Sequence, residues 1–516
     1  MSYKFTRHRF LTVLGAGTAC LAVTGTAGVG LLGRAQKKVR PLHAPRTGPL
    51  LAPKVWPLPG ASPANLARPW DFRSRPDLSP PAVEVTTQAH DTAPGHVFVA
   101  PQAGDGGQGG SLIVDDGGQV AWFRPLRGPS GRAMNFRVQT YRGEPVLTWG
   151  ETPGMYVVYD SSYREIARFG AANGRNGDHH EFLISPQDTA LITIYNAVPK
   201  DLSSVGGKKD GLAVQGIVQE LDIETGKLLF EWRSLDHVGL DESYGKPGED
   251  LDHPGIDYFH INSIDVDHDD NLLISARKTS AVYNIDRKTG EVIWRLGGKK
   301  SDFEMGEGTR FAFQHDARRQ PDGTITIFDN GAPPEVHDQS RGIVVELDEE
   351  AMKATLVREY THPEEPLATS QGNLQVLPNG NVFIGWGTEP YNSEYARDGK
   401  LIFDLQFSGE TQSYRAFRQE WTGRPSEAPA VAAEKGKGDK VNVYASWNGA
   451  TEATTWRVLA GPDPEELEPV GSVPWEGFET AMAIRTDEPY VAVRAEDDSG
   501  RVLGTSEAIK PKSRSG

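Results

Sequence analysis

The sequence predicts an all-β protein, a six-bladed β-propeller followed by a small C-terminal β-sandwich that is fibronectin type III-like. Three observations lead to this prediction. The 516 residues contain 57 glycines and 36 prolines, and these lie mostly in turns, as in chains built from many short strands. A unit of four short strands recurs about six times, every 40–60 residues or so. Beyond residue 440 the pattern changes to alternating strands with tryptophans and acidic turns.

The chain begins with a predicted targeting segment. TRHRF at 6–10 precedes a stretch at 11–33 that has no charge and many Gly and Ala residues. A basic start followed by small apolar residues is typical of export signals and signal anchors. We therefore expect residues 1–38 to be a signal peptide or a signal anchor. The protein is then exported, to the outside or the cell surface, by a twin-arginine-like route or with this segment as a membrane anchor.

The domain boundaries follow from composition. Residues 39–80 are Pro-rich and irregular, which predicts a linker. The repeats at 81–424 predict the propeller. A second linker at 425–440 separates them from the sandwich expected at 441–510.

The propeller prediction depends on the internal repeats. Each copy has a short strand, a turn of Pro, Asp, Asn or Gly, a β-branched strand and then a hairpin, as in the ETGK and KTGE turns. Four antiparallel strands per unit are typical of a propeller blade. A solenoid is the alternative, and the antiparallel hairpins make it the less favoured one. The copies are HEFLISPQDTALITIY from 180, NSIDVDHDDNLLISAR from 262, HDARRQPDGTITIFDN from 315 and GNLQVLPNGNVFIGWG from 372, with weaker ones from 135 and around 96–123.

Charge and cysteine content exclude some classes of function. The net charge of −16 argues against general nucleic-acid binding, which needs a basic face. Cys20 is the only cysteine, so the chain can form no intramolecular disulfide.

Polar residues occupy equivalent places in successive repeats. His180, Asn262 and His315 open three of the copies, and His260 lies two residues before Asn262, on the same face of its strand. Arg277 lies at the end of a second strand. In a radial arrangement these positions meet at one end of one channel. Polar channel residues can also simply hold water, but three histidines with an arginine at matched positions favour a functional site.

Two kinds of site fit these residues. Three histidines could bind zinc, but Arg277 would repel a cation. No carboxylate is expected among the histidines, since Asp316 follows His315 directly and faces the other side of the strand. Arg277 and Asn262 are suited to bind an anionic group with three oxygens. A neutral histidine can attack such a group, and another histidine can protonate the leaving oxygen.

Two segments resemble a known family. FHINSIDVDHDDNLLISARKTSAVYNIDRKTGEVIWRLGGKKSDF at 259–303 and FAFQHDARRQPDGTITIFDNG at 311–331 are similar to bacterial arylsulfate sulfotransferases, in the actinobacterial and fungal branch of the arylsulfotransferase family. The resemblance extends over about 90–420. It implies a six-bladed propeller that moves a sulfuryl group from a phenolic sulfate ester to a phenol. The route it implies is a ping-pong reaction through a sulfohistidine, without a nucleotide sulfate donor.

The resemblance also implies residue roles. The nucleophile matches His315 in QHDAR, and the sulfate-binding arginine matches Arg277. The second channel histidine and its neighbouring asparagine match His260 and Asn262. The remaining histidine matches HHEF, which is His180, with the adjacent His179 as the alternative.

Two further substrate-binding candidates are weaker. Ser370 corresponds to a hydroxyl contributed by the last blade, and Asn330 shares the repeat position of Arg277. The implied partners are an aryl sulfate donor and a phenolic acceptor, with no cofactor, no metal and no nucleic acid. The chain departs from the enteric members because it lacks their disulfide and adds the C-terminal domain.

Two other functions remain open from the sequence. One is a non-catalytic extracellular binding propeller for a glycan, a phenolic compound or a surface partner, in which Trp122, Trp149 and Trp386 would contact the ligand. The other is a metal-dependent hydrolase or lactonase with a histidine-lined channel.

Overall fold

The computed structural model describes residues 55–58, 69–102, 107–126, 131–249, 255–409 and 411–513. The targeting segment expected at 1–38 lies outside these residues. Within them the regular secondary structure is almost entirely β-strand, with the short helix α1 (Ser234–His237) and two single 3₁₀ turns, Ser203–Val205 and Leu240–Glu242. The all-β prediction is therefore confirmed.

Six sheets of four antiparallel strands follow one another between residues 96 and 419 of the described chain. In five of them the four strands are consecutive in sequence. These are β6 (Ala133–Tyr141), β7 (Glu144–Glu151), β8 (Met155–Tyr159) and β9 (Glu165–Gly170); β10 (Asp178–Ile184), β11 (Thr189–Lys200), β12 (Gly211–Asp222) and β13 (Leu228–Arg233); β15 (Ile261–Val266), β16 (Leu272–Ala276), β17 (Ala281–Ile285) and β18 (Val292–Gly297); β20 (His315–Arg319), β21 (Ile325–Asp329), β22 (Arg341–Asp348) and β23 (Lys353–Tyr360); and β24 (Asn373–Val376), β25 (Val382–Gly385), β26 (Tyr391–Tyr395) and β27 (Leu401–Phe407).

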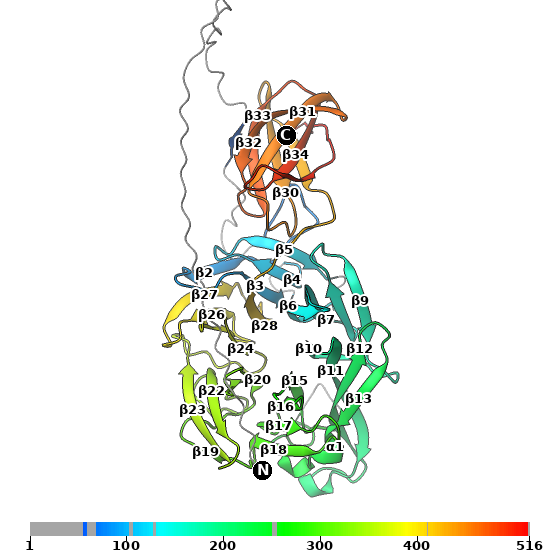
Figure 1. Ribbon diagram of the computed structural model, residues 1–516, viewed down its shortest axis with the longest axis vertical. Helices are drawn as coiled ribbons and strands as arrows, with labels where there is room; N and C mark the ends of the chain where they lie inside the picture. The colour runs from blue at the N-terminus through cyan, green and yellow to red at the C-terminus, as the bar shows by residue number, and fades with distance from the viewer. Residues whose placement is uncertain are drawn as a thin grey trace, which may run out of the picture. The chain divides into compact units, whose positions relative to one another are not determined.

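The sixth sheet joins the two ends of this region. Its order is β28 (Ser413–Gln419), β3 (His96–Pro101), β4 (Gly110–Val114) and β5 (Val120–Pro125). The inner strands contact one another in the cyclic order β28, β6, β10, β15, β20, β24 and back to β28. The six sheets therefore form a closed ring with the six inner strands around its axis (Figure 1), and we call the region between these strands the channel.

Three short strands extend sheets of this ring. β14 (Ile256–Asp257) pairs in parallel with β12, and β19 (Glu304–Met305) pairs in parallel with β23. β2 (Val83–Thr87) lies antiparallel on the outer edge of β27. β14 matters for the site because it carries Asp257, as described below.

The sequence explains the hairpins locally. In the ETGK turn the Asp222 carboxylate accepts hydrogen bonds from the N–H and hydroxyl of Thr225, at 2.8 and 2.6 Å, and Gly226 adopts a φ of +68°. In the KTGE turn Asp286 accepts from two main-chain N–H groups, and Gly290 has a φ of +78°. Glycine adopts such a left-handed conformation without steric cost, so both turns use the same chemistry.

Amide side chains join neighbouring inner strands. The Gln375 amide donates to the carbonyl of Arg418 and accepts from its N–H, at 3.0 and 2.9 Å. The Gln419 amide makes the same pair of bonds with Val138, at 2.9 and 2.7 Å. These bonds take the place of main-chain hydrogen bonds between neighbouring sheets, which are not paired through their backbones. We call Gln375 and Gln419, with the similarly placed Asn373, the amide clasps.

The apolar cores lie between neighbouring sheets, and they contain the three tryptophans expected to contact a ligand. Trp149 and Trp386 have no exposed surface, and Trp122 is 4% exposed. Their rings pack against other core side chains, such as Phe136 and Phe328. A ligand-stacking role is therefore wrong for Trp149 and Trp386.

Two more four-stranded sheets complete the described chain. One has the order β1 (Val55–Pro57), β33 (Glu479–Arg485), β30 (Lys440–Ser446) and β29 (Ala430–Lys435). The other has the order β32 (Glu466–Pro474), β31 (Thr455–Asp463), β34 (Tyr490–Glu496) and β35 (Val502–Thr505). A shared core around Trp456 fills the space between them.

Parts of both expected linkers belong to these folded regions. β1 comes from the Pro-rich segment 39–80, and Trp70 and Phe72 of the same segment are buried in an apolar cluster. β29 comes from the segment 425–440. The C-terminal sheets also contact the ring, because the Asn448 amide bonds both the N–H and the carbonyl of Phe123, each at 2.8 Å. No helix in the described parts of the chain is long and apolar enough to cross a membrane.

Candidate active site

The three predicted histidines lie where inner strands of successive sheets begin. His180 is in β10, His260 directly precedes β15, and His315 opens β20. Strand pairing is irregular at each of them, and His260 has a left-handed φ of +54°, which few residues other than glycine adopt. Because of these irregularities, the side chains at these positions do not alternate regularly between the two faces of the strand. The register shifts lie between Asp178 and Phe182, Ile261 and Ser263, and His315 and Arg318.

His180 and His260 are each paired with a carboxylate. The Nδ1 of His180 lies 2.5 Å from Asp178 Oδ1, and the Nδ1 of His260 lies 2.5 Å from Asp257 Oδ2. The two imidazole rings meet edge to face, with their centroids 5.2 Å apart and an interplanar angle of 83°. Two histidine–carboxylate pairs therefore stand side by side.

In the two pairs, burial and the charge of the partner have different net effects on the pKa. Burial alone would raise the pKa of Asp178, but His180 and its hydrogen bonds lower that pKa to about 2. Burial lowers the pKa of His260, and this effect exceeds the opposite effect of Asp257. Asp178 is thus ionised at neutral pH, and the neutral form of His260 is favoured.

His315 is held in one tautomer by Asn330. The Asn330 Nδ2 donates to the carbonyls of Ala368 and Gln371, at 3.1 and 3.0 Å, so its Oδ1 must be the atom that faces His315 Nδ1 at 2.7 Å. His315 Nδ1 therefore carries the proton, and Nε2 carries the lone pair. Nε2 accepts the N–H of Gln371 at 3.2 Å.

His315 is also neutral. Its side chain is buried, and burial together with the positive charge of Arg277 holds the pKa of His315 well below its usual value. A buried, neutral imidazole with an oriented Nε2 lone pair is the form that a nitrogen nucleophile requires. Asn330, expected to bind substrate, contacts His315.

Arg277 connects two sheets at the site. Its Nη2 donates to the Thr369 carbonyl at 2.8 Å, and its guanidinium lies 5.5 Å from the centre of the Phe313 ring. Its main-chain N–H donates to the His260 carbonyl at 2.9 Å. The chain from Thr369 to Gln371 therefore lies beside both Arg277 and His315, and it brings the half-buried Ser370 to the site.

Asn262 is buried and holds two inner strands together. Its Nδ2 donates to the Gln314 carbonyl at 2.7 Å, which leaves a second N–H on the same nitrogen. Its main-chain carbonyl accepts from Arg415 at 2.8 Å and from the Tyr414 hydroxyl at 3.2 Å.

Two tyrosines enclose the paired histidines. The Tyr195 ring lies 5.2 Å from His180 and 5.3 Å from His260, and the Tyr414 ring lies 5.4 Å from His180 and 6.3 Å from His315. Burial raises the pKa of both tyrosines well above the usual value, so their hydroxyls stay protonated. These rings restrict the access of water to the imidazoles.

Of the two histidines in HHEF, His180 faces the other site residues. The His179 Nε2 instead accepts the N–H of Gly154 at 3.3 Å, and its ring packs against Gly150 on a neighbouring sheet.

A buried layer of charges lies one step further along the inner strands. Glu181 accepts hydrogen bonds from Arg137 at 3.0 Å, from Arg415 at 3.1 Å and from Arg318. Asp316 pairs with Arg318 and Arg415, at 2.7 and 3.3 Å. Burial alone would raise the pKa of Glu181, but the three arginines lower it. This layer separates the histidines from the other end of the channel.

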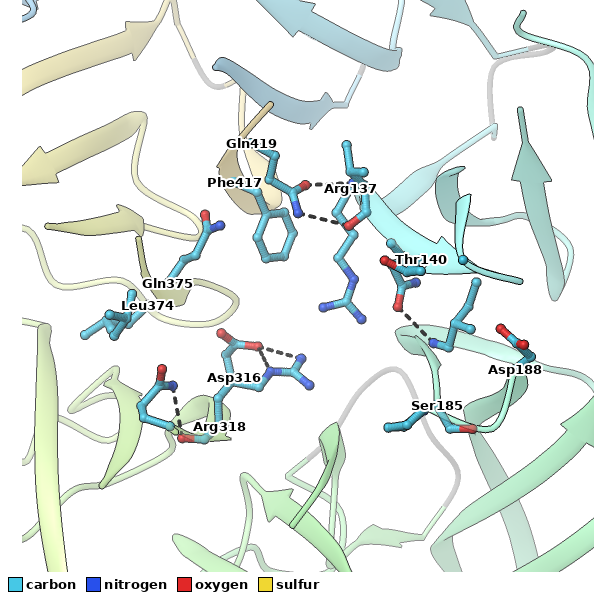
Figure 2. A pocket seen from close by; sticks show the side chains of 17 residues that line it. Arg137, Thr140, Ser185, Asp188, Asp316, Arg318, Leu374, Gln375, Phe417 and Gln419 are labelled. Carbon is cyan, nitrogen blue, oxygen red and sulfur yellow. Dashed lines mark hydrogen bonds and ion pairs between the residues drawn. The ribbon is translucent and has the colours of Figure 1, made fainter. Parts of the chain in front are cut away.

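The other end of the channel opens into a pocket of about 700 Å³. Arg137, Asp316 and Arg318 line it together with Gln375 and Gln419 (Figure 2). Most of these polar groups are already bonded to protein atoms, as in the amide clasps. The pocket contains none of the histidines.

The carboxylates of the site were missed in the sequence. The expectation that no carboxylate lies among the histidines is wrong, because Asp178 and Asp257 contact His180 and His260. A signal existed, since each aspartate lies two or three residues before its histidine. Tyr414 was also missed, because it belongs to the strand that closes the ring. Among the described residues, no group of three or more His, Cys, Asp or Glu side chains is arranged to hold a metal ion.

Comparisons with known proteins place the chain in a family. A search of curated proteins found no match. Solved structures similar to the chain include a Bacteroides caccae protein of unknown function, with 15% identity, a TM-score of 0.39 and coverage of 63% of this chain and 100% of that one. A catalytically inactive virginiamycin B lyase from Staphylococcus aureus with quinupristin has 8% identity, a TM-score of 0.35 and coverage of 78% and 99%.

These structural likenesses are too distant to support an argument about function. The family model for arylsulfotransferase (ASST), in contrast, matches residues 137–408, more than half of the chain. The matched range includes His180, His260, Arg277 and His315. The chain belongs to the arylsulfotransferase family.

Proposed function

We propose that this protein is an aryl-sulfate sulfotransferase that moves a sulfuryl group from a phenolic sulfate ester to a phenol. The group is carried on His315 as a sulfohistidine, and no nucleotide sulfate donor takes part. Membership of the arylsulfotransferase family supports sulfuryl transfer in general. The observation that carries the finer proposal is the buried, neutral His315, whose Nε2 lone pair is fixed by the Asn330 contact at 2.7 Å.

In the first half-reaction His315 Nε2 attacks the sulfur of the donor ester. The N–S bond forms, the bond from sulfur to the phenolic oxygen breaks, and the phenolate takes a proton from His260 or His180. Nδ1 keeps its proton, which Asn330 Oδ1 continues to accept. The attack requires that the bond from the Gln371 N–H to Nε2 be given up, and this N–H can then donate to a sulfuryl oxygen.

Arg277 and Asn262 stabilise the transferring group. A sulfuryl group, like a phosphoryl group, passes through a loose transition state, so positioning and charge account for most of the catalysis. Arg277 supplies a fixed positive charge next to His315, and Asn262 supplies its second amide N–H. In the second half-reaction the acceptor phenol loses its proton to the same histidines and attacks the sulfur, and His315 is released.

We also propose the architecture in which this reaction takes place. The six sheets are the blades of a six-bladed β-propeller, the catalytic domain at 81–424. The C-terminal sheets form a fibronectin type III-like β-sandwich at 441–510. We further propose that residues 1–38 direct export, because a phenolic donor that needs no nucleotide can be used outside the cell.

The test is incubation of the full chain with 4-nitrophenyl sulfate, without an acceptor, followed by peptide mass analysis. We expect one sulfuryl adduct on the peptide that contains His315, together with a burst of nitrophenol of one equivalent. The adduct should be absent in His315→Ala and present in His268→Ala, a matched change at an exposed histidine. Added phenol should discharge it.

The other outcomes contradict the proposal in distinguishable ways. Turnover of the ester that a chelator abolishes, without an adduct, would indicate a metal-dependent hydrolase. A folded protein that binds the ester but neither releases nitrophenol nor forms an adduct would indicate a binding propeller.

A further inference from the structure

Each imidazole of the adjacent pair is oriented by its own carboxylate. Asp178 Oδ1 accepts the His180 main-chain N–H at 2.9 Å and the Thr193 hydroxyl at 3.3 Å, in addition to the imidazole. The Asp257 side chain has no exposed surface, and β14, which carries it, is fixed to β12 by parallel pairing. The Asp178 carboxylate is therefore held from several sides, and the backbone that carries Asp257 is fixed. With Nδ1–H bonded to a carboxylate, each histidine presents Nε2 as the atom that can give or take a proton.

From this arrangement we propose that Asp178, His180, His260 and Asp257 act as one unit that stores a single mobile proton, with Asp178 and Asp257 as positioning residues. The proposal rests on the proposed sulfuryl transfer. In that reaction the free enzyme gives one proton to the leaving phenolate and receives one from the acceptor phenol. A store with a capacity of one proton balances both half-reactions, so no proton exchange with water is needed.

The groups around the two imidazole rings limit the unit to one stored proton. Two imidazolium rings at a centroid distance of 5.2 Å repel each other, and Arg277 adds a permanent positive charge. His180 and Arg277 both lower the pKa of His260, in the same direction as burial. A second proton on the pair is therefore opposed. The titratable and charged groups that face the two rings are Asp178, Asp257, Arg277, His315, Tyr195 and Tyr414.

The kinetic test uses Asp257→Asn and Asp178→Asn. We expect kcat to fall about 10- to 1000-fold in each variant, with little change in KM. A loss of this size is a large part of what general acid–base catalysis contributes. Removal of the Asp257 charge should lower the pKa of His260 further, because the carboxylate favours the charged ring. For the donor half-reaction, which needs the proton, the alkaline limb of kcat/KM should move about one to three units to lower pH. Asp257→Glu should restore part of the rate and of the profile.

A matched control comes from the surface. Asp91 lies 3.1 Å from His90 and both side chains are mostly exposed, so Asp91→Asn removes a histidine–carboxylate contact outside the site. It should leave both kcat and the pH profile unchanged. A double variant, Asp178→Asn with Asp257→Asn, should lose less than the product of the two single losses, because the residues act on one proton. The proposal is overturned if the loss of kcat in the double variant equals the product of the two single losses. It is also overturned if both single variants keep the wild-type pH profile.

A second readout needs no activity. In ¹⁵N-labelled protein, imidazole nitrogen shifts should show Nδ1–H on both His180 and His260, with uptake of one proton shared by the two rings. Asp257→Asn should change the shifts of both rings. If wild-type protein transfers no sulfuryl group but shows this shared titration, sulfuryl transfer fails and the proton-storing unit stands. If transfer occurs and the rings titrate as two independent groups, the unit fails and sulfuryl transfer stands.

Discussion

The two ends of the ring's channel use polar residues in different ways. At the end where the inner strands begin, His180, His260 and His315 are buried or half-buried beside charges that shift pKa values. At the end where the strands finish, a pocket of about 700 Å³ is lined by side chains such as Gln375 and Gln419, whose amides bond the main chain. The pocket at this end is therefore not the place where reactive groups converge. Shifted pKa values and converging side chains therefore indicate the reactive site better than pocket volume does.

The largest expected effect is at His315. His315→Ala should lower kcat by about 10⁴-fold or more, because it removes the nitrogen that attacks the sulfur and carries the sulfuryl group. The melting temperature should change little by comparison. Steady-state rates with 4-nitrophenyl sulfate and a phenol, alongside thermal unfolding, measure both. A variant that keeps more than a tenth of the wild-type rate would show that His315 is not the nucleophile.

The next effect is at Asn330. Asn330→Ala removes the acceptor for the His315 Nδ1–H and leaves the carbonyls of Ala368 and Gln371 without their donor. We expect kcat to fall about 100- to 1000-fold, in the range of a lost orienting contact, while KM stays within a few-fold. The buried amide Asn284, which bonds Asp267 away from the site, is the control. Asn284→Ala should lower stability but not kcat, and equal losses of kcat in the two variants would contradict the orienting role.

A smaller effect is expected at Arg277. Arg277→Lys keeps the charge but loses the planar guanidinium that contacts Thr369 and Phe313. The ratio kcat/KM for the donor should fall about 10- to 100-fold, since a lysine holds the sulfuryl oxygens as a point charge. Arg287→Lys, at an ion pair with Glu220, should leave kcat/KM unchanged. A full-rate Arg277→Lys enzyme would mean that charge alone matters.

The comparison of the two ends also shows what the sequence could predict. The repeated turns located the strands, and the aligned repeat starts identified His180, His260 and His315 as neighbours. The histidine–carboxylate pairs were not predictable from alternation, because bulges interrupt the strands at these positions. Asp257 lies on β14, a two-residue strand with no periodic signal. The role of Asn330 depends on two carbonyls from a segment about 40 residues away, and only the folded ring brings them together.

The smallest effect is expected at the far end, where Gln419 clasps β28 to β6. Gln419→Ala removes two hydrogen bonds to Val138, at 2.9 and 2.7 Å, across the junction beside the closing strand. The free energy of unfolding should fall by about 1–3 kcal/mol, because the N–H and carbonyl of Val138 lose their partner in a half-buried place. We expect kcat at 25 °C to be unchanged, since the buried charge layer lies between this residue and the histidines.

Gln320→Ala is the matched control for the clasp. Gln320 lines the same pocket, but its amide bonds Thr326 and Arg318 within its own sheet, at 3.0 and 3.4 Å. Its loss should cost less than the loss of Gln419, because no junction between sheets depends on it. Urea unfolding of the two variants measures the difference. If both lose the same stability, the clasps add nothing beyond ordinary hydrogen bonds. A loss of kcat in Gln419→Ala without a loss of stability would instead mean that the two ends of the channel are coupled through the charge layer.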